Sequence, residues 1–208
     1  MKIGIMGGTF DPIHNGHLHL AQTALTQFDL DQIWFMPNGM PPHKKQSSIE
    51  SDIHERIAMT QIAIKANKQF YLQEYEAKRE KVSYSYKTME HFRKIYPDDE
   101  FYFIIGADSL FSIETWKHPE RLFKACIILA ACRDEAATKE SLNGQIQMLK
   151  GKYGAYIKFL AMPLEHVSSH EIRKLIESGE PVSEYIPAEV EAYIRKEGLY
   201  GSGNRKNQ

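Results

Sequence analysis

The sequence predicts an α/β protein built on a doubly wound parallel sheet with a small C-terminal helical portion. Short, almost continuously apolar runs alternate with longer segments whose apolar residues recur at helical spacing. Strands that are apolar on both faces suit a parallel sheet that helices cover on both sides. The 208 residues are enough for one such domain, which we expect over residues 1–200.

Each expected strand is a short apolar run that turn residues or polar residues follow. The expected strands are 2–6, 33–36, 70–72, 101–105, 126–131 and 157–161. Between them, apolar residues at helical spacing predict helices over 18–28, 53–64 and 85–95. In a sheet of this kind, ligands bind beyond the carboxyl ends of the strands, so residues that directly follow strands are the candidates for function.

The helical portion at the C-terminal end is expected over residues 168–200. Ser168 can cap a helix that stops near Gly179, and Pro187 opens a second helix. The tail 201–208, with the sequence GSGNRKNQ, is expected to be disordered.

Composition indicates an ordinary soluble protein and disfavours two classes of partner. Hydrophobic residues make up 42% and the net charge is -1, which argues against a nucleic-acid-binding module. No signal-peptide core is present, and no apolar run reaches the ~18 residues that span a bilayer. Cys126 and Cys132 are expected to be buried free thiols on one strand, as suits a reducing cytoplasm.

The first predicted strand ends in a glycine turn with the sequence GGTFDPIHNGHL. Gly7 and Gly8 let the backbone approach a phosphate closely, and the following helix offers N–H groups and a positive dipole. His14 and His17 lie three residues apart, so both rings can face that phosphate. Capping and packing, or a zinc pair, are the alternatives for these histidines. The spacing fits neither a Walker A loop nor GxGxxG, which disfavours a P-loop hydrolase and a dinucleotide-binding dehydrogenase.

This segment resembles the phosphate-binding signature of the nucleotidyltransferase superfamily. Its Gly-Gly-Thr-Phe-Asp-Pro form is similar to that of the bacterial nicotinate-mononucleotide adenylyltransferases in particular. The resemblance implies a Rossmann-like sheet, with ATP phosphates surrounded by five residues of the turn and helix: Gly7, Gly8, Thr9, His14 and His17.

Two further segments match that family. The segment PPHK resembles one in which a lysine approaches bound phosphate, which implies this role for Lys44; a solvated basic loop is the alternative. The segment SYSYKT resembles a Ser-Tyr-Thr stretch, which implies that Ser85 and Tyr86 meet the nicotinate carboxylate; Ser83 or Ser85 as a plain helix N-cap is the alternative. Ser85 stands where the family has threonine, so the hydroxyl is kept and the methyl group is lost.

The fourth matching segment is GADSL, which follows a predicted buried strand. The resemblance implies that Asp108 accepts hydrogen bonds from ribose hydroxyls of the bound nucleotides, and Gly106 is expected to bind ATP. It also implies that Trp116 stacks on the pyridine ring, for which a large flat side chain is suited. A tryptophan of the core is the alternative.

The fifth matching segment, VSSHEIR, resembles the second signature of the superfamily. It implies that helix amides, Ser168, Ser169 and Arg173 form a second anion clamp, whereas a surface arginine is the alternative. His170 stands where threonine is common. Arg133 is expected to reach phosphate, although the proline that often follows this arginine in the family is absent.

Together, the five segments imply transfer of the adenylyl group of ATP to nicotinate mononucleotide, giving the dinucleotide and pyrophosphate in NAD biosynthesis. The nucleophile is already an anionic phosphate oxygen, so positioning and charge neutralisation suffice. His14, His17, Lys44 and Arg173 are the expected neutralising residues. Mg²⁺ is expected between phosphate oxygens, without a protein ligand cage.

Other functions stay open. A sister transferase would use nicotinamide mononucleotide, a pantetheine phosphate or another small phosphate, and a sensor would bind the nucleotide without reaction. The presence of both histidines disfavours the sensor. A homo-oligomer is possible, because Val190, Tyr193 and Ile194 fit a dimer face as well as an intramolecular one.

Overall fold

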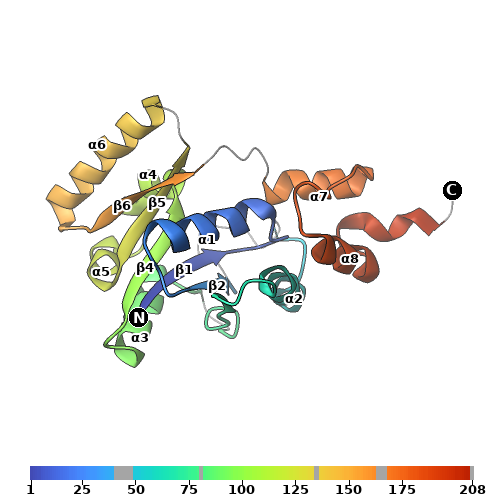
Figure 1. Ribbon diagram of the computed structural model, residues 1–208, viewed down its shortest axis with the longest axis horizontal. Coiled ribbons are helices and arrows are strands. Elements are labelled where there is room, and N and C mark those ends of the chain that lie inside the picture. The colour runs from blue at the N-terminus through green and yellow to red at the C-terminus, as the bar shows by residue number, and fades with distance from the viewer. Residues whose placement is uncertain (40–48, 80–81, 134–135, 163–167, 207–208) are drawn as a thin grey trace.

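The computed structural model describes the backbone of residues 1–39, 49–79, 82–133, 136–162 and 168–206, and side chains there except at 132–133, 136–139, 162 and 203–206. In this part of the chain, six strands form one parallel sheet in the order β3-β2-β1-β4-β5-β6 (Figure 1). The strands are β1 (Lys2–Gly8), β2 (Gln32–Pro37), β3 (Phe70–Leu72), β4 (Glu100–Gly106), β5 (Ile127–Arg133) and β6 (Ile157–Met162).

The order of the strands reverses between β1 and β4. These neighbours run parallel, with Met6 beside Ile104, while Met6 faces Phe35 of β2 on its other side. In an open α/β sheet, this reversal leaves a crevice at the carboxyl ends of the two strands. The expected ligand edge therefore lies at the ends of β1 and β4.

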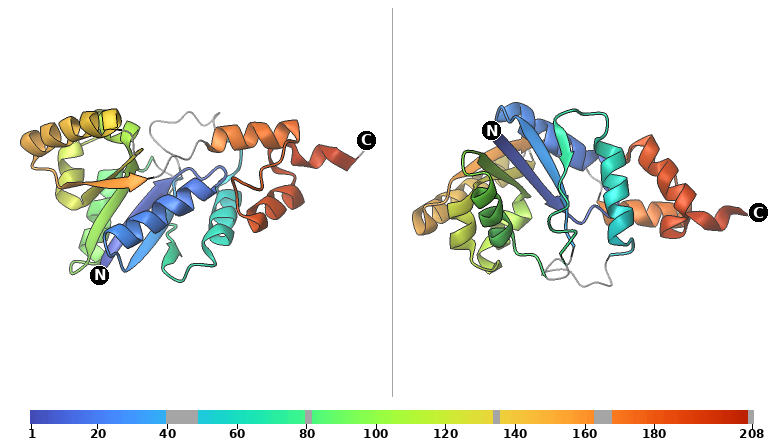
Figure 2. Two further views of the ribbon diagram at one scale, coloured as in Figure 1. Left: turned by 45° about the horizontal axis from the view of Figure 1, so that its top comes forward. Right: turned by 90° about the horizontal axis from the view of Figure 1, so that it is seen from below.

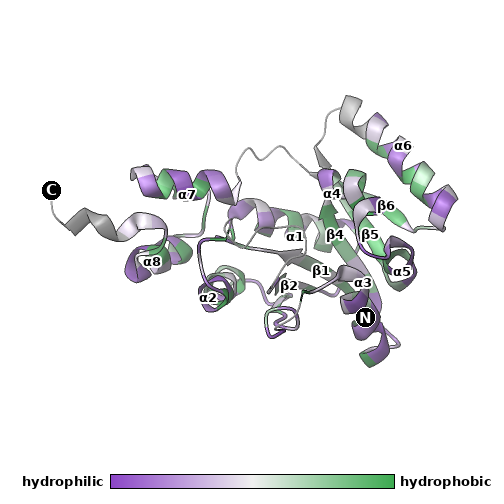
Figure 3. Cartoon of the chain, turned by 180° about the vertical axis from the view of Figure 1, so that it is seen from behind, coloured by the Kyte–Doolittle hydropathy of each residue, from purple (hydrophilic) through white to green (hydrophobic). Residues whose placement is uncertain are grey.

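Helices cover both faces of the sheet, as the sequence predicts (Figures 1 and 2). They are α1 (Asn15–Gln27), α2 (Ile53–Ile64), α3 (Ser85–Ile95), α4 (Ala107–Ser112), α5 (Pro119–Ala125), α6 (Ala136–Tyr153), α7 (Ser169–Ser178) and α8 (Ala188–Glu197). One core cluster joins the sheet to α3, α4, α5 and α6, and the other joins it to α1, α2, α7 and α8. Figure 3 shows the strands in hydrophobic colours and hydrophilic turns on the helices that cover them.

The C-terminal helices begin and end at the residues that the sequence predicts. The Ser168 hydroxyl accepts a hydrogen bond from the Glu171 N–H, which caps α7. Gly179 ends this helix in the left-handed region with φ 78°, and Gly198 ends α8 with φ 67°. Glycine adopts this conformation without the steric cost of a Cβ atom.

The face of α8 that was compatible with a dimer interface is used within the chain. Val190 and Ile194 are buried in the core cluster that joins the sheet to α1, α2, α7 and α8. Tyr193 packs against the same cluster. Helix α8 also packs on α2. Val190, Tyr193 and Ile194 therefore attach the C-terminal portion to the rest of the domain.

Several expectations need correction. Cys126 is buried and free, but it does not lie on a strand. Helix α5 extends to Ala125, so Cys126 ends this helix one residue before β5 begins. The side chain of Cys132 lies outside the described residues. The tail departs from the expected disorder: η3 (Leu199–Lys206) is a 3-10 helix, and the Ser202 hydroxyl donates to the Ile194 carbonyl. Helices α4, α5 and α6 were not predicted, because two are short and α6 contains Gly144 and Gly151.

No helix in the described part of the chain is both long enough and apolar enough to cross a membrane.

Candidate active site

A cleft of about 460 Å³ opens where β1 and β4 end. This volume is in the range of sites that hold small ligands. Eight residues that the sequence singles out line it: Gly7, Gly8, Thr9, His17, Ser85, Tyr86, Gly106 and Trp116. They come from β1, α1, α3, β4 and the segment after α4, so the fold brings together parts of three of the five matching segments.

The glycine turn has a shape that only particular residues allow. A Cβ atom on Gly8 would lie 2.6 Å from Cε1 of Phe10, whose ring is fully buried and cannot move aside. Phe10 itself adopts φ 52°, in the left-handed region. A Cβ on Gly7 would make only ordinary contacts, and one on Gly106 would meet nothing within 4 Å. Gly8 is therefore the glycine that the turn requires.

The two signature histidines lie against each other at the start of α1. The backbone N–H of His14 donates to Nδ1 of His17 over 3.2 Å. A neutral His17 ring consequently carries its proton on Nε2, from which it can donate to an anion in the cleft.

His14 is the buried member of this pair. Its side chain is 8% exposed, and Nδ1 has no hydrogen-bond partner within the described residues. Burial lowers the pKa of His14 to about 4, so without ligand the ring is uncharged at neutral pH. His14 would therefore meet a phosphate as a neutral hydrogen-bonding group, not as a preformed cation.

Ser169 and Arg173, which were expected to form a second anion clamp, contact the loop that follows the glycine turn. The Ser169 hydroxyl donates to the Pro12 carbonyl over 2.9 Å, and Arg173 Nη1 donates to the Asp11 carbonyl over 2.8 Å. Arg173 Nε also pairs with Glu50 at 2.7 Å, and the Arg173 side chain is only 10% exposed. The surface-arginine alternative is therefore wrong, because this guanidinium is enclosed between the loop and Glu50.

Arg56 is a buried residue at this edge that sequence reasoning missed. Its side chain is 2% exposed, and Nη1 donates to the carbonyl oxygens of Thr9 and Asn38, each over 2.8 Å. It thereby ties the turn after β1 to the turn after β2. The available signal was its spacing, since Arg56 shares the buried face of α2 with Met59.

Part of the lining of the cleft is aromatic. Trp116 is half-buried and packs edge-on against Phe103, with ring centroids 6.4 Å apart. Tyr86 is buried, and the guanidinium of Arg121 lies 4.5 Å above its ring. Tyr84, which caps α3 through its backbone, also lines the wall, so neither Ser83 nor Ser85 is the N-cap.

This wall also contains buried polar groups. Glu76 is 7% exposed and accepts a hydrogen bond from the Thr88 hydroxyl over 2.7 Å. Burial raises the pKa of Glu76, which favours its neutral form. The Ser83 hydroxyl is buried without a hydrogen-bond partner in the described part of the chain. Sequence reasoning singled out neither as a ligand-facing group.

The remaining predicted residues lie elsewhere. Asp108 lies in the first turn of α4, directly after Gly106, but is not among the residues that line the cleft. Lys44 and the side chain of Arg133 lie outside the described residues. The described residues hold no group of three or more His, Cys, Asp or Glu side chains placed for a metal ion, so the zinc-pair alternative has no third ligand there.

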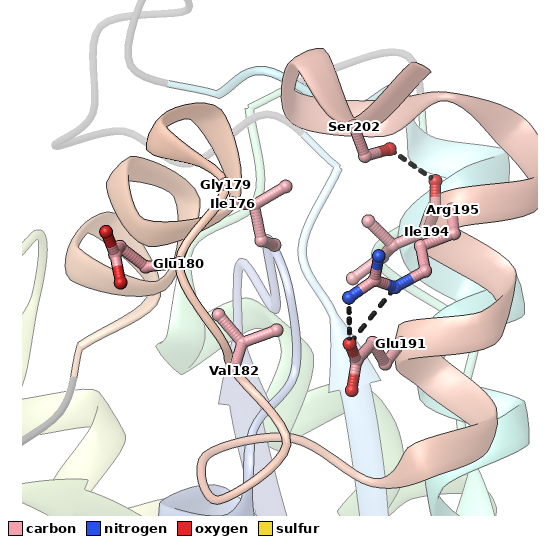
Figure 4. Close-up of a pocket in the computed structure, with 8 residues that line it drawn as sticks. All are labelled: Ile176, Gly179, Glu180, Val182, Glu191, Ile194, Arg195 and Ser202. Carbon is pink, nitrogen blue, oxygen red and sulfur yellow. Dashed lines mark hydrogen bonds and ion pairs between the residues drawn. The ribbon is translucent and has the colours of Figure 1, made fainter. Parts of the chain in front are cut away.

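A second pocket lies between α7, α8 and η3, away from the strand ends (Figure 4). Its volume of about 20 Å³ is close to that of one water molecule. The Arg195–Glu191 ion pair stands at its wall. This pocket is too small for a nucleotide. The cleft at the strand ends is the candidate site because residues of three matching segments line it.

A cleft lined by backbone amides of the glycine turn, by the His17 imidazole and by aromatic side chains suits two nucleotides at once. On a sheet of this order, the combination marks the chain as a nucleotidyltransferase.

Known proteins agree with that class. The cytidylyltransferase-like family model matches residues 5–175. A probable nicotinate-nucleotide adenylyltransferase of Clostridium kluyveri is 40% identical, over 96% of this chain and 99% of its own. One of Carboxydothermus hydrogenoformans is 43% identical, over 96% and 98%. The chain therefore belongs to the cytidylyltransferase-like family, within its nicotinate-nucleotide adenylyltransferases.

Solved structures show the same fold. The Plasmodium falciparum nicotinic acid mononucleotide adenylyltransferase complexed with NaAD has a TM-score of 0.78 and 22% identity, covering 96% of this chain and 97% of that one. The same protein complexed with APC gives a TM-score of 0.77 at the same identity and coverage.

Proposed function

We propose that this chain transfers the adenylyl group of ATP to nicotinate mononucleotide, giving nicotinic acid adenine dinucleotide and pyrophosphate. The observation that carries the proposal is the single cleft that joins the glycine turn and His17 to the wall of Tyr86 and Trp116. The names of the relatives support the same reaction, which is a step of NAD biosynthesis.

In the proposed reaction, a 5′-phosphate oxygen of nicotinate mononucleotide attacks the α-phosphorus of ATP. The new P–O bond forms as the bond to the β-phosphate oxygen breaks, and pyrophosphate leaves with that electron pair. No proton has to be removed from the nucleophile, so the protein needs to align the phosphates and stabilise their charge. Gly8, Thr9 and the N-terminus of α1 supply amides, while Nε2 of His17 supplies a hydrogen bond.

Further groups are proposed to complete the phosphate site. Arg173 would exchange Glu50, which is 50% exposed, for a phosphate oxygen. Ser168, Ser169 and Lys44 are proposed to act beside it. Such an exchange of one anion for another leaves the buried guanidinium paired throughout, which avoids the cost of an isolated buried charge.

The carboxylated pyridine ring is proposed to bind between Trp116 and the start of α3. The positive end of the α3 dipole, the Ser85 hydroxyl and the Tyr86 amide favour a carboxylate there. Burial raises the pKa of Glu76, which reduces the repulsion between this side chain and the bound carboxylate. Asp108 is proposed to meet ribose hydroxyls, Gly106 to bind ATP, and Arg133 to meet the phosphate of nicotinate mononucleotide.

Nucleotidyltransferases of this kind generally use a divalent metal, and we propose Mg²⁺. The carboxylate among the residues that line the described cleft, Glu76, already accepts a hydrogen bond from Thr88. The cleft therefore fits a cation that phosphate oxygens and water chiefly coordinate. When bound, the ion would neutralise phosphate charge.

We also propose that residues 1–200 form a single domain and that the protein is located in the cytoplasm. In that compartment the buried free thiol of Cys126 stays reduced.

A pyrophosphate-release assay tests the proposal. ATP and Mg²⁺ are supplied with nicotinate mononucleotide, nicotinamide mononucleotide or phosphopantetheine in parallel, with EDTA as the metal control. We expect strong preference for the nicotinate nucleotide. Turnover with phosphopantetheine alone would instead show a sister transferase, and ATP binding without turnover on any acceptor would show a sensor.

A further inference from the structure

The hydrogen-bond network around Asp11 extends beyond the proposed phosphate contacts. The Asp11 carboxylate is 2% exposed and accepts three hydrogen bonds. Oδ2 accepts from the Glu50 N–H over 2.8 Å, while Oδ1 accepts from the Ser51 N–H over 3.2 Å and from the Tyr200 hydroxyl over 2.7 Å. The Ser51 hydroxyl donates to the Tyr200 oxygen over 2.7 Å, so this phenol is both donor and acceptor.

This network joins three segments that lie far apart in the sequence. Asp11 lies in the loop between the glycine turn and His14, Ser51 directly precedes the capping residue of α2, and Tyr200 belongs to η3. Burial and the Asp11 carboxylate both raise the pKa of Tyr200, so its hydroxyl keeps its proton at neutral pH. The proton of this phenol thus remains available for Asp11.

The loop that carries Thr9 and His14 is held mainly from outside itself. Arg56 donates to the Thr9 carbonyl, Arg173 to the Asp11 carbonyl and Ser169 to the Pro12 carbonyl. The Asn15 N–H donates to the Tyr185 carbonyl over 2.7 Å. Three of these four partners belong to the C-terminal portion, as Tyr200 does.

We propose that Tyr200 is a positioning residue for ATP binding, which holds the phosphate loop in its binding geometry through the carboxylate of Asp11. The proposal rests on the proposed function for the identity of the ligand. Phe10 adopts the left-handed region within this loop, so the conformation needs support from neighbouring contacts. Tyr200 and Ser51 supply that support at the carboxylate next to Phe10. The C-terminal portion thereby fixes the conformation of the phosphate loop. Tyr200 itself does not line the cleft, so it acts on the loop from behind.

The first test is direct binding of ATP, measured by calorimetry with the full chain and no second substrate. Tyr200→Phe keeps the ring and removes one donor to Asp11, and we expect ATP affinity to fall roughly tenfold, since a small displacement of a positioned group is costly. Tyr193→Phe makes the same change on α8 of the same portion, and we expect affinity within about twofold of the parent. Equal affinity of Tyr200→Phe and the parent protein overturns the proposal.

A kinetic split separates positioning from plain loss of stability. We expect Tyr200→Phe to raise the KM for ATP while leaving the KM for nicotinate mononucleotide within about twofold, with the folded fraction checked by thermal melting. An equal rise in both KM values would show a structural role only. If the parent protein binds ATP but makes no dinucleotide, the proposed function fails while the binding test still decides this inference.

A double-variant cycle tests whether the effect passes through Asp11. In an Asp11→Asn background, Tyr200→Phe should change ATP affinity by less than about twofold, because residues in one network are not additive. If the tenfold loss persists there, Tyr200 does not act through Asp11.

Discussion

The imidazole rings of His14 and His17 lie with centroids 3.7 Å apart, yet the two residues have different environments. His14 is buried, whereas His17 lines the cleft and accepts the His14 backbone N–H through Nδ1. The two histidines are therefore expected to have different roles. His14 packs at the start of α1, and His17 is the member of the pair that lines the cleft, where its Nε2 is proposed to meet phosphate.

Replacement of His17 by alanine should lower kcat by roughly 100-fold, the usual effect of removing one hydrogen bond to transition-state charge. The fold should persist, because His17 is only partly buried. Steady-state kinetics with a thermal melt measures both properties. His19→Ala, an exposed change on the same helix, is the control. Near-normal turnover of His17→Ala would contradict the role of Nε2.

The buried His14 should make stability depend on pH. Its pKa is about 4 in the folded protein against 6.5 for an unperturbed histidine, so the unfolded chain binds more protons between these values. The free energy of unfolding should therefore fall as pH drops from about 6.5 to about 4, by roughly 3 kcal/mol from this residue. Urea unfolding at several pH values measures the slope. His14→Gln should flatten it, while His19→Gln should not; identical slopes for all three proteins would contradict burial as the cause.

Trp116→Ala should raise the KM for nicotinate mononucleotide by roughly three- to tenfold, which corresponds to one aromatic contact. The KM for ATP should change far less, because Trp116 is proposed to contact the pyridine ring and not the phosphates of ATP. Trp116→Phe should retain part of the affinity. Equal rises in both KM values would show that Trp116 only supports Phe103, which it contacts edge-on.

Arg56→Lys should destabilise the fold although the charge is kept. The guanidinium bridges the carbonyls of Thr9 and Asn38, and an ammonium lacks that planar geometry. We expect a loss of about 1–3 kcal/mol in urea unfolding. Arg195→Lys alters an ion pair whose arginine is 55% exposed and should change stability by less than about 1 kcal/mol. Equal losses in the two variants would contradict the bridging role.

Glu50→Gln should strengthen ATP binding at low ionic strength. Arg173 pairs with Glu50 at 2.7 Å, and under the proposed function a bound phosphate would replace this carboxylate. Because Glu50 is half-exposed, we expect only a gain of roughly two- to fivefold in affinity. Titrations at low and high salt should show the gain shrinking with salt. Weaker binding by the variant would mean that Glu50 supports the phosphate site instead of competing for it.

Most of the fold was predictable because its signals are local. Apolar runs predicted all six strands of the described sheet to within two residues, and capping residues predicted the ends of α7. Three helices were not predicted from the sequence. Helices α4 and α5 are too short to show a helical period, and α6 contains two glycines. In the tail that was expected to be disordered, the structure describes a 3-10 helix that runs from Leu199 to Lys206.

The sequence by itself determined the class of sheet, the glycine turn and the residues of both signatures. These depend on chain periodicity and on residue types at fixed spacing, which neighbours along the chain decide. Only the tertiary structure decided that Arg56 holds the turn, that Arg173 is enclosed and that Tyr200 reaches Asp11. Such contacts join residues up to 189 positions apart, and a buried polar side chain is paired by whichever group the fold places beside it.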